Sequence, residues 1–301
     1  MAADDLHAGR PFRSVLYIPG SKGRALEKAR SLAADAIIFD LEDAVAPAEK
    51  DNARAAVAAA LAEGGYGRRT LIVRVNGLET PWGAADLAAA AAMKADAVLL
   101  PKVDAPDDVH AAEALLERAG APADLALWAM METPAGILRA PQIAAASPRL
   151  AGFVMGTNDL LKEIGGRFRP DRLPLSAALA LAILAARAEG LVCVDGVYNA
   201  FRDTEGLRRE CEDGRDRGFD GKTLIHPVQI PIANEVFGPS EEEIAEARRI
   251  IAAFEEAERA GQGVAVLDGR IIENLHVESA RRLLARAEAI AAMAAAEGKD
   301  G

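Results

Sequence analysis

The sequence predicts an α/β fold: a closed parallel barrel of the TIM (β/α)8 type, followed by a C-terminal helical extension. Eight short apolar runs recur along the chain, and nearly every one ends in a polar or ionisable residue. Alanine-rich stretches with helical spacing lie between these runs. Strands that alternate with helices are typical of a parallel barrel, whose working face lies at the carboxyl ends of the strands.

The expected strands are short and strongly apolar. They cover residues 15–18, 36–40, 71–74, 97–100, 127–132, 153–155, 191–195 and 223–226. The expected connecting helices cover residues 23–34, 52–61, 83–93, a segment that begins at Pro106, 141–147, 176–189 and 204–217. In the first of these helices the small and apolar residues share one face, which is the pattern of a helix that packs on a sheet.

The pattern changes after the eighth strand, so we assign residues 13–236 to the barrel and 237–301 to the extension. Ser240 to Glu243 has the form of a capping box at the start of a helix. Asp268-Gly269 is a turn signal within a short hairpin, and residues 277–293 form an apolar-striped final helix. Because such a helix pair must bury its stripe, we expect the extension to cover its own barrel or that of a neighbouring copy.

Composition narrows the functional class. The net charge is −11, from 35 basic and 46 acidic residues, which disfavours binding to nucleic acid or to an anionic membrane. The first twelve residues do not read as a secretory signal, and no run of eighteen apolar residues occurs. The two cysteines, Cys193 and Cys211, have no metal-type spacing. These features are typical of a cytoplasmic enzyme.

The working face of the barrel is expected to gather many charges. The side chains at the strand ends are Glu42, Asp43, Arg74, Lys102, Glu132, Asp159, Asp195 and His226. No buried core tolerates such a collection without partners or a function for it. No role is assigned to Asp195.

Glu132 and Asp159 form the sharpest pair, because each follows an apolar strand. Two carboxylates on neighbouring strand ends can point at one hard cation and leave positions open for water and substrate, as Mg²⁺ requires. The alternative is that Asn158-Asp159 caps a helix that starts at Leu160.

Arg74 ends the third strand, where a guanidinium suits binding of a carboxylate or of a developing oxyanion. The alternative is a structural ion pair with Glu42 or Asp43, and the two roles are compatible. Because three adjacent acids cannot all face one point, we expect at least one of Asp40, Glu42 and Asp43 to be structural, for instance as a partner of Arg74. Asp43 is expected to support the catalytic groups.

A basic cluster surrounds the Pro19-Gly20-Ser21 turn and comprises Lys22, Arg24 and Lys28, with Tyr17 beside it. Such a cluster could hold the phosphates of a large anionic ligand, or it could be a solvated helix face. His226 could contact a ligand, or it could be structural.

Seven segments resemble the citrate lyase β-subunit-like CoA-ester lyases of the HpcH/HpaI aldolase superfamily. They are residues 13–21, 39–45, 74–77, 100–102, 131–136, 156–160 and 222–227. Residues 195–203 and 273–276 are most similar to the (3S)-malyl-CoA thioesterase and malyl-CoA lyase branch. The resemblance implies a Mg²⁺-dependent TIM barrel that forms a homotrimer or a hexamer and acts on short hydroxyacyl-CoA esters.

The resemblance also implies residue roles. Glu132 and Asp159 would hold Mg²⁺, for which Mn²⁺ could substitute, and Arg74 would bind the thioester side of the substrate. The positions that would contact CoA or substrate are Tyr17, Lys22, Lys28, Asn158, Ile225 and His226. Glu273 stands where the lyases place an acid/base aspartate, which their C-terminal extension delivers to a neighbouring barrel. Its side chain is longer by one methylene, and a shift of about 1 Å can cost about 10²-fold in rate.

We therefore expect hydrolysis of (3S)-malyl-CoA to malate and CoA, with Glu273 as the general base. One alternative is C–C cleavage of malyl-CoA, β-methylmalyl-CoA or citramalyl-CoA to an acyl-CoA and a 2-oxo acid. A metal-dependent pyruvate aldolase is a second alternative, which the basic cluster disfavours. A citrate lyase β-type subunit that depends on an acyl carrier protein is a third.

Overall fold

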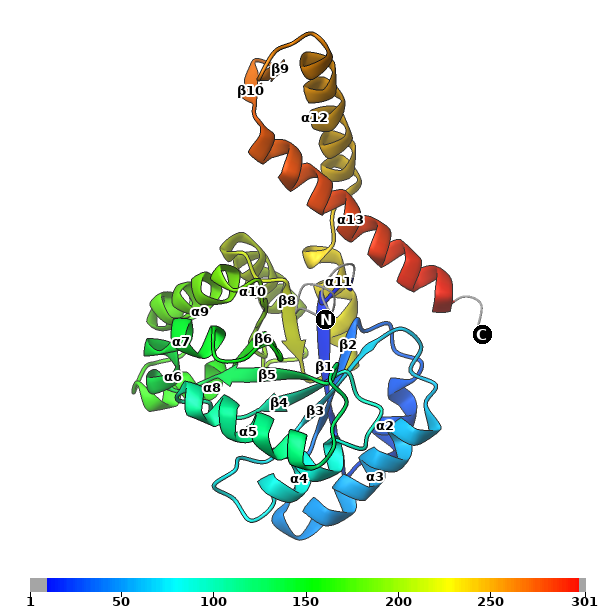
Figure 1. The fold of residues 1–301 in the computed structure, drawn as a ribbon, viewed down its shortest axis with the longest axis vertical. Coiled ribbons are helices and arrows are strands. Elements are labelled where there is room, and N and C mark those ends of the chain that lie inside the picture. The colour runs from blue at the N-terminus through cyan, green and yellow to red at the C-terminus, as the bar shows by residue number, and fades with distance from the viewer. Residues whose placement is uncertain (1–9, 298–301) are drawn as a thin grey trace. The chain divides into compact units, whose positions relative to one another are not determined.

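The computed structural model of the 301-residue chain describes residues 10–297, and within them eight parallel strands close into a barrel (Figure 1). The strands follow one another in chain order, and β8 pairs with β1. Their bounds are β1 Ser14–Pro19, β2 Ala36–Asp40, β3 Thr70–Arg74, β4 Ala97–Leu100, β5 Ala126–Met131, β6 Leu150–Met155, β7 Val192–Asp195 and β8 Gly221–Leu224. The barrel prediction is confirmed.

Helices surround this barrel on its outer side (Figure 1). Their bounds are α2 Gly23–Ala29, α3 Lys50–Glu63, α4 Gly83–Ala90, α5 Pro106–Arg118, α6 Pro134–Leu138, α7 Ala140–Ala144, α8 Thr157–Glu163, α9 Ser176–Ala188, α10 Thr204–Arg217 and α11 Ile230–Phe237. Three short 3-10 helices are η1 Pro47–Glu49, η2 Leu173–Leu175 and η3 Pro227–Gln229.

Two expected helices, 23–34 and 83–93, end earlier than expected, at Ala29 and Ala90, and three larger differences occur elsewhere. The segment expected at 141–147 is replaced by α6 and α7, and α6 begins early because Thr133 caps it by accepting the Gly136 N–H. Helix α11 was not expected. Helix α8 begins at Thr157, so Asp159 lies inside its first turn and Gly156 is the N-cap residue. The interpretation of Asn158-Asp159 as a cap is therefore wrong.

Alternation along the strands divides the apolar side chains into two layers. One buried cluster contains strand residues such as Ile38, Ile72 and Trp128 and no helix residue, so it fills the barrel interior. The other contains Ile37 and Phe39 together with helix residues, so it lies between strands and helices. Because the side-chain period of a strand is two, the inward positions continue to the strand ends. Inward side chains at those ends can thus meet at the mouth of the barrel.

The described residues divide into two compact units, 12–237 and 238–297 with 10–11. In the second unit, α12 Glu241–Arg259 is followed by the hairpin β9 Ala265–Leu267 and β10 Arg270–Ile272, and then by α13 Asn274–Glu297. Ser240 and Glu243 form the expected capping box, with Ser240 N–H donating to Glu243 Oε2 at 2.7 Å. The assignment of residues 237–301 as a covering extension stays a prediction.

Among residues 10–297, no helix combines the length and the apolarity that crossing a bilayer requires.

Candidate active site

A cavity of about 300 Å³ opens at the carboxyl ends of the barrel strands. Its lining includes Arg74 and the two expected metal ligands, Glu132 and Asp159. The lining residues are Tyr17, Asp40, Asp43, Ala44, Arg74, Met130, Glu132, Met155, Gly156, Thr157, Asn158, Asp159, Val197, Asn199, Thr223 and Ile225. This volume is at the lower end of the range typical of small-molecule sites.

Arg74 lies at the centre of an acidic cluster on one side of this cavity. Its Nε and Nη2 donate to the two carboxylate oxygens of Asp40, each at 2.7 Å. Its Nη1 lies 2.8 Å from Glu42 Oε2 and 3.5 Å from Asp43 Oδ2. The expected structural ion pair is therefore present, and Asp40, one of the three acids expected to supply a structural partner, makes the closest contacts.

The expectation that the three acids cannot face one point is wrong, because the chain turns sharply after β2. Asp40 accepts the backbone N–H groups of Glu42 at 2.9 Å and of Ala44 at 3.0 Å. This local turn wraps residues 41–44 around the guanidinium. Burial alone would lower the pKa of Arg74, but the neighbouring Tyr17 and Asp40 raise it well above its ordinary value. The guanidinium is thus permanently charged and held in one orientation.

Glu132 follows β5 and is only 2 % exposed, and its Oε1 accepts the backbone N–H of Lys102 at 2.8 Å. Burial raises the pKa of Glu132 to about 7. The Lys102 hydrogen bond opposes this shift, whereas the negative charges of Glu42 and Asp159 add to it. Negative charge is therefore incompletely compensated at this end of the cavity.

The backbone around Glu132 is shaped to hold its carboxylate. A Cβ atom on Gly156 would collide with Cβ and Oε2 of Glu132, so glycine leaves the space that this side chain fills. Lys102 adopts a φ of +48°, in the left-handed region, at the point where its N–H meets Glu132. Both positions favour one placement of the carboxylate.

Glu132 and Asp159 suit a hard divalent cation. They line the same cavity, and the negative charge of Asp159 raises the electrostatic cost of ionising Glu132, which a cation would relieve. Two carboxylates are a common protein contribution to a Mg²⁺ site. In the part of the chain that the structure describes, no group of three or more His, Cys, Asp or Glu side chains is placed to hold a metal ion.

The other expected contact residues divide into two groups. Tyr17, Asn158 and Ile225 line the cavity, and Tyr17 lies under Arg74, with the guanidinium 4.9 Å from its ring centroid. Lys22 and Lys28 do not line it and are exposed at the start and end of α2.

His226 also lies outside the lining residues of the cavity. Its ring stacks on Phe201 with 4.6 Å between centroids, and its Nδ1 accepts the Val228 N–H at 3.2 Å. These contacts give His226 a local structural function at the start of η3.

Comparison with known proteins places the chain in a family. Residues 13–227 match the family described as HpcH/HpaI aldolase/citrate lyase. The chain belongs to this family. It is 65 % identical over 289 residues to the (3S)-malyl-CoA thioesterase of Cereibacter sphaeroides (strain KD131 / KCTC 12085), an alignment that covers 96 % of this chain and 99 % of that one.

More distant members of the HpcH/HpaI aldolase/citrate lyase family resemble it over nearly the full length. The citrate lyase subunit beta of Escherichia coli (strain K12) is 38 % identical, with 93 % of this chain and 94 % of that one covered. The crystal structure of CitE from Mycobacterium tuberculosis in complex with magnesium, acetoacetate and coenzyme A superposes with a TM-score of 0.76. It is 32 % identical, and 94 % of this chain and 99 % of that one are covered.

Glu273 belongs to the second unit and lies between β10 and α13. Its side chain is exposed, and its backbone N–H donates to His276 Nδ1 at 3.0 Å. Within residues 10–297, no hydrogen bond or ion pair engages its carboxylate. The catalytic role of Glu273 in this member of the family stays a prediction.

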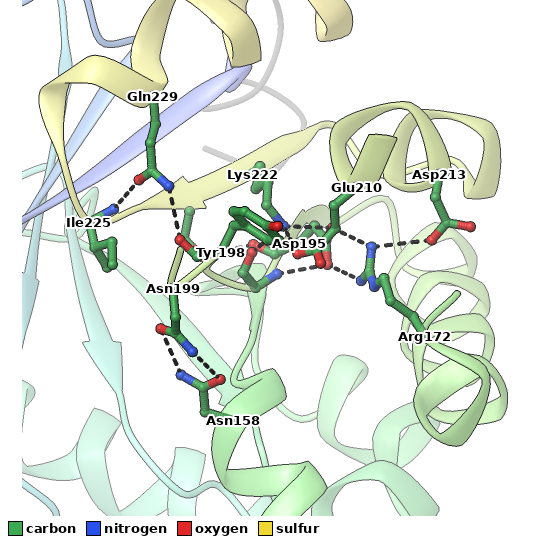
Figure 2. A network of polar contacts seen from close by, with 12 residues as sticks. Asn158, Arg172, Asp195, Tyr198, Asn199, Glu210, Asp213, Lys222, Ile225 and Gln229 are labelled. Carbon is green, nitrogen blue, oxygen red and sulfur yellow. Dashed lines mark hydrogen bonds and ion pairs between the residues drawn. The ribbon is translucent and has the colours of Figure 1, made fainter. Parts of the chain in front are cut away.

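Asp195 does not reach the working face, contrary to the expectation. Val192 and Val194 of β7 point into the barrel, so Asp195 points outward. There its carboxylate pairs with Arg172 at 2.5 Å and with Lys222 Nζ at 3.2 Å, and all three side chains are buried (Figure 2). Lys222 lies inside the strand-like run 221–224, where a side chain is expected to be buried. A buried lysine requires a counter-ion, so this residue was the signal in the sequence that an acid must lie beside it.

Proposed function

We propose that this chain is a Mg²⁺-dependent hydrolase that converts (3S)-malyl-CoA to malate and CoA. The observation that carries the proposal is that Arg74, Glu132 and Asp159 line one cavity at the carboxyl ends of the strands. The thioesterase of Cereibacter sphaeroides, at 65 % identity, supports the choice of substrate and reaction. Solved structures of CitE and of a citrate lyase beta subunit from Mycobacterium tuberculosis, both in complex with magnesium, support the metal.

Glu132 and Asp159 would hold the cation, and Mn²⁺ would serve as a substitute because it accepts the same oxygen donors. When bound, Mg²⁺ supplies a Lewis acid that polarises substrate oxygens. Lys102 keeps Glu132 Oε1 engaged through its backbone N–H, which orients the carboxylate toward the cavity.

Arg74 stabilises negative charge that develops on the thioester oxygen. Because three carboxylates surround it, the guanidinium contributes fixed N–H donors rather than a net positive field. Asp43 is its most distant partner, at 3.5 Å with a side chain that is 62 % exposed. Asp43 can therefore give up its place beside Nη1 to the substrate while Glu42 stays at 2.8 Å, which gives Asp43 its part in catalysis.

Glu273 of a neighbouring subunit acts as the general base that takes a proton from the attacking water. Tyr17, Asn158 and Ile225 contact the substrate at the cavity. Lys22, Lys28 and His226 contact the CoA moiety farther out. This arrangement requires an assembly, which we propose to be a homotrimer or a hexamer.

We place this activity in the cytoplasm. The two cysteines are buried and unpaired in the structure, which suits a reducing compartment.

Product analysis tests the reaction. Purified enzyme with (3S)-malyl-CoA and Mg²⁺ should release free CoA thiol and malate in equal amounts, with no glyoxylate. Release of glyoxylate and acetyl-CoA without free CoA would establish the C–C lyase instead, which the citrate lyase relatives keep as the second candidate. Turnover only of an acyl group attached to a carrier protein would identify a citrate lyase β-type subunit.

Substitution of the carboxylates tests the site. Glu132→Ala and Asp159→Ala should each abolish Mg²⁺-dependent turnover. Glu163→Ala is the matched control, because Glu163 is an exposed carboxylate at the end of the same helix as Asp159. Retention of activity in either of the first two variants would refute the metal assignment.

A further inference from the structure

Asn199 is a cavity residue to which no role has been assigned so far. It comes from the segment that joins β7 to α10, residues 196–203, which we call the β7 loop. Its Nδ2 donates to Asn158 Oδ1 at 2.9 Å, and Asn158 Nδ2 donates back to Asn199 Oδ1 at 3.3 Å (Figure 2). A reciprocal amide pair of this kind fixes both side chains, since each supplies one donor and one acceptor.

The β7 loop is a firm support for this pair. Lys222 Nζ donates to the Gly196 carbonyl at 2.6 Å, and Lys222 is itself buried beside Asp195. Gln229 is fully buried, and its Nε2 donates to the Tyr198 carbonyl at 2.9 Å (Figure 2). Two buried side chains therefore hold the backbone on the N-terminal side of Asn199.

The other member of the pair precedes Asp159 directly. Helix α8 starts with Gly156 as its N-cap and has no side-chain cap, so its first turn lacks that usual restraint. The β7 loop comes very close to this turn, because a Cβ atom on Gly196 would lie 2.7 Å from Thr157 Cγ2. The Asn158 amide is exposed, and its hydrogen-bond partner is Asn199.

We propose that Asn199 is a positioning residue that fixes Asp159 through Asn158 for binding of the cation. The inference rests on the proposed function, because it assigns Asp159 to the metal. Residues that do not touch a metal ion but orient the side chains that bind it affect metal affinity. We expect their effect on fold stability to be smaller. Lys222 and Gln229 act behind Asn199 by holding the loop.

Magnesium binding without substrate tests the proposal. In isothermal titration calorimetry with MgCl₂ alone, Asn199→Ala and Asn199→Ser should each weaken affinity by about tenfold, the lower end for an outer partner of a ligand. Their melting temperatures should stay close to that of the wild type, because Asn199 is exposed. Asn52→Ala is the matched control, since Asn52 is an exposed amide on α3 that contacts Glu49, and it should bind like the wild type.

A double substitution separates positioning from direct contact. If Asn199 acts through Asn158, the variant N158A/N199A should bind Mg²⁺ no more weakly than Asn158→Ala alone. The proposal would be overturned if the two substitutions weakened Mg²⁺ affinity independently, so that the loss in the double variant is the product of the two single losses. It would also be overturned if Asn199→Ala left Mg²⁺ affinity unchanged and only raised KM. A wild-type protein that fails to bind Mg²⁺ would instead refute the proposed function itself, and the inference with it.

Discussion

Glu132 combines burial with a position beside other acids, and its raised pKa of about 7 makes magnesium binding dependent on pH. An acid with a raised pKa keeps its proton below that value, whereas a cation needs the ionised form. Magnesium should therefore bind about tenfold more weakly at pH 6 than at pH 8, because the ionised fraction falls by that factor.

Calorimetry in buffers of different ionisation enthalpy measures this effect, since the proton released on binding adds its heat. Near pH 6 almost one proton should be released per Mg²⁺ bound, and near pH 8 almost none, because Glu132 is then already ionised. An affinity that is the same at both pH values would show that Glu132 is ionised before the metal arrives.

Gly156 is predicted to be irreplaceable for a steric reason. In Gly156→Ala the new Cβ would collide with Glu132, and an overpacked buried position typically costs about 1–3 kcal/mol of stability. Magnesium binding should fall along with the melting temperature. Gly23→Ala is the control, because a Cβ at Gly23 meets no atom within 4 Å, and this variant should keep both properties.

Local sequence patterns identified some site residues and missed others. Arg74 and Glu132 were identified because each is a charged residue at the end of an apolar run. Such a residue is uncommon, and its position places it at the carboxyl end of a strand. The pairing of Asn158 with Asn199 joins residues 41 positions apart, and no short-range pattern encodes it. The local pattern offered Asp40 only as one of three possible partners of Arg74. The register of β2 and β3 singles it out, because it brings these two inward residues side by side.

Strand β7 shows how the alternation of side chains between the two faces of a strand separates site residues from structural residues. Asp195 ends an apolar run as Glu132 does, but it follows an inward residue and therefore faces the outer layer. Counting the alternation would have excluded it from the working face. The start of helix α8 was misplaced for another reason. The sequence offered a helix from Leu160 as an alternative, but α8 begins at Thr157, and Gly156 gives no side-chain capping signal.

The buried pair of Asp195 with Arg172 and Lys222 is predicted to matter for stability. Burial opposes ionisation of Asp195, but Lys222 and Arg172 outweigh it and lower the pKa of Asp195 below its ordinary 3.8. A lowered pKa means that the stabilisation is present above pH 3.8 and is lost as the pH falls through the folded-state value. At pH 7, Asp195→Asn should therefore lower the free energy of unfolding by about 3–5 kcal/mol, because Arg172 and Lys222 lose the fully buried counter-ion that they share. Each then keeps one less-buried partner, Asp213 for Arg172 and Glu210 for Lys222.

Urea denaturation followed by tryptophan fluorescence measures this loss. Asp213→Asn is the matched control, since Asp213 contacts the same Arg172 at 3.2 Å but its side chain is 36 % exposed. A partly solvated pair of this kind should contribute no more than about 1 kcal/mol. Equal losses in the two variants would contradict the importance of burial.

The local structure of the second unit, residues 238–297, could be predicted from the sequence, but its function could not. The capping box at Ser240 and the turn at Asp268-Gly269 depend on residues a few positions apart, and both are present. The function of Glu273 depends instead on how subunits assemble, which no pattern within one chain specifies. Its substitution by alanine should lower turnover by about 10²-fold or more and leave CoA-ester affinity nearly unchanged, as expected for a general base.

Mixing two inactive variants determines whether Glu273 serves a neighbouring subunit. Glu273→Ala subunits keep an intact barrel site, and Glu132→Ala subunits keep an intact Glu273. If Glu273 acts in trans within a cyclic assembly, random co-assembly at equal amounts should restore about one quarter of wild-type activity, because each site needs one barrel and one neighbour of the right kind. If Glu273 acts within its own chain, every subunit carries one defect and no activity returns. Separately purified oligomers mixed without exchange should stay inactive, which ties any recovery to shared sites.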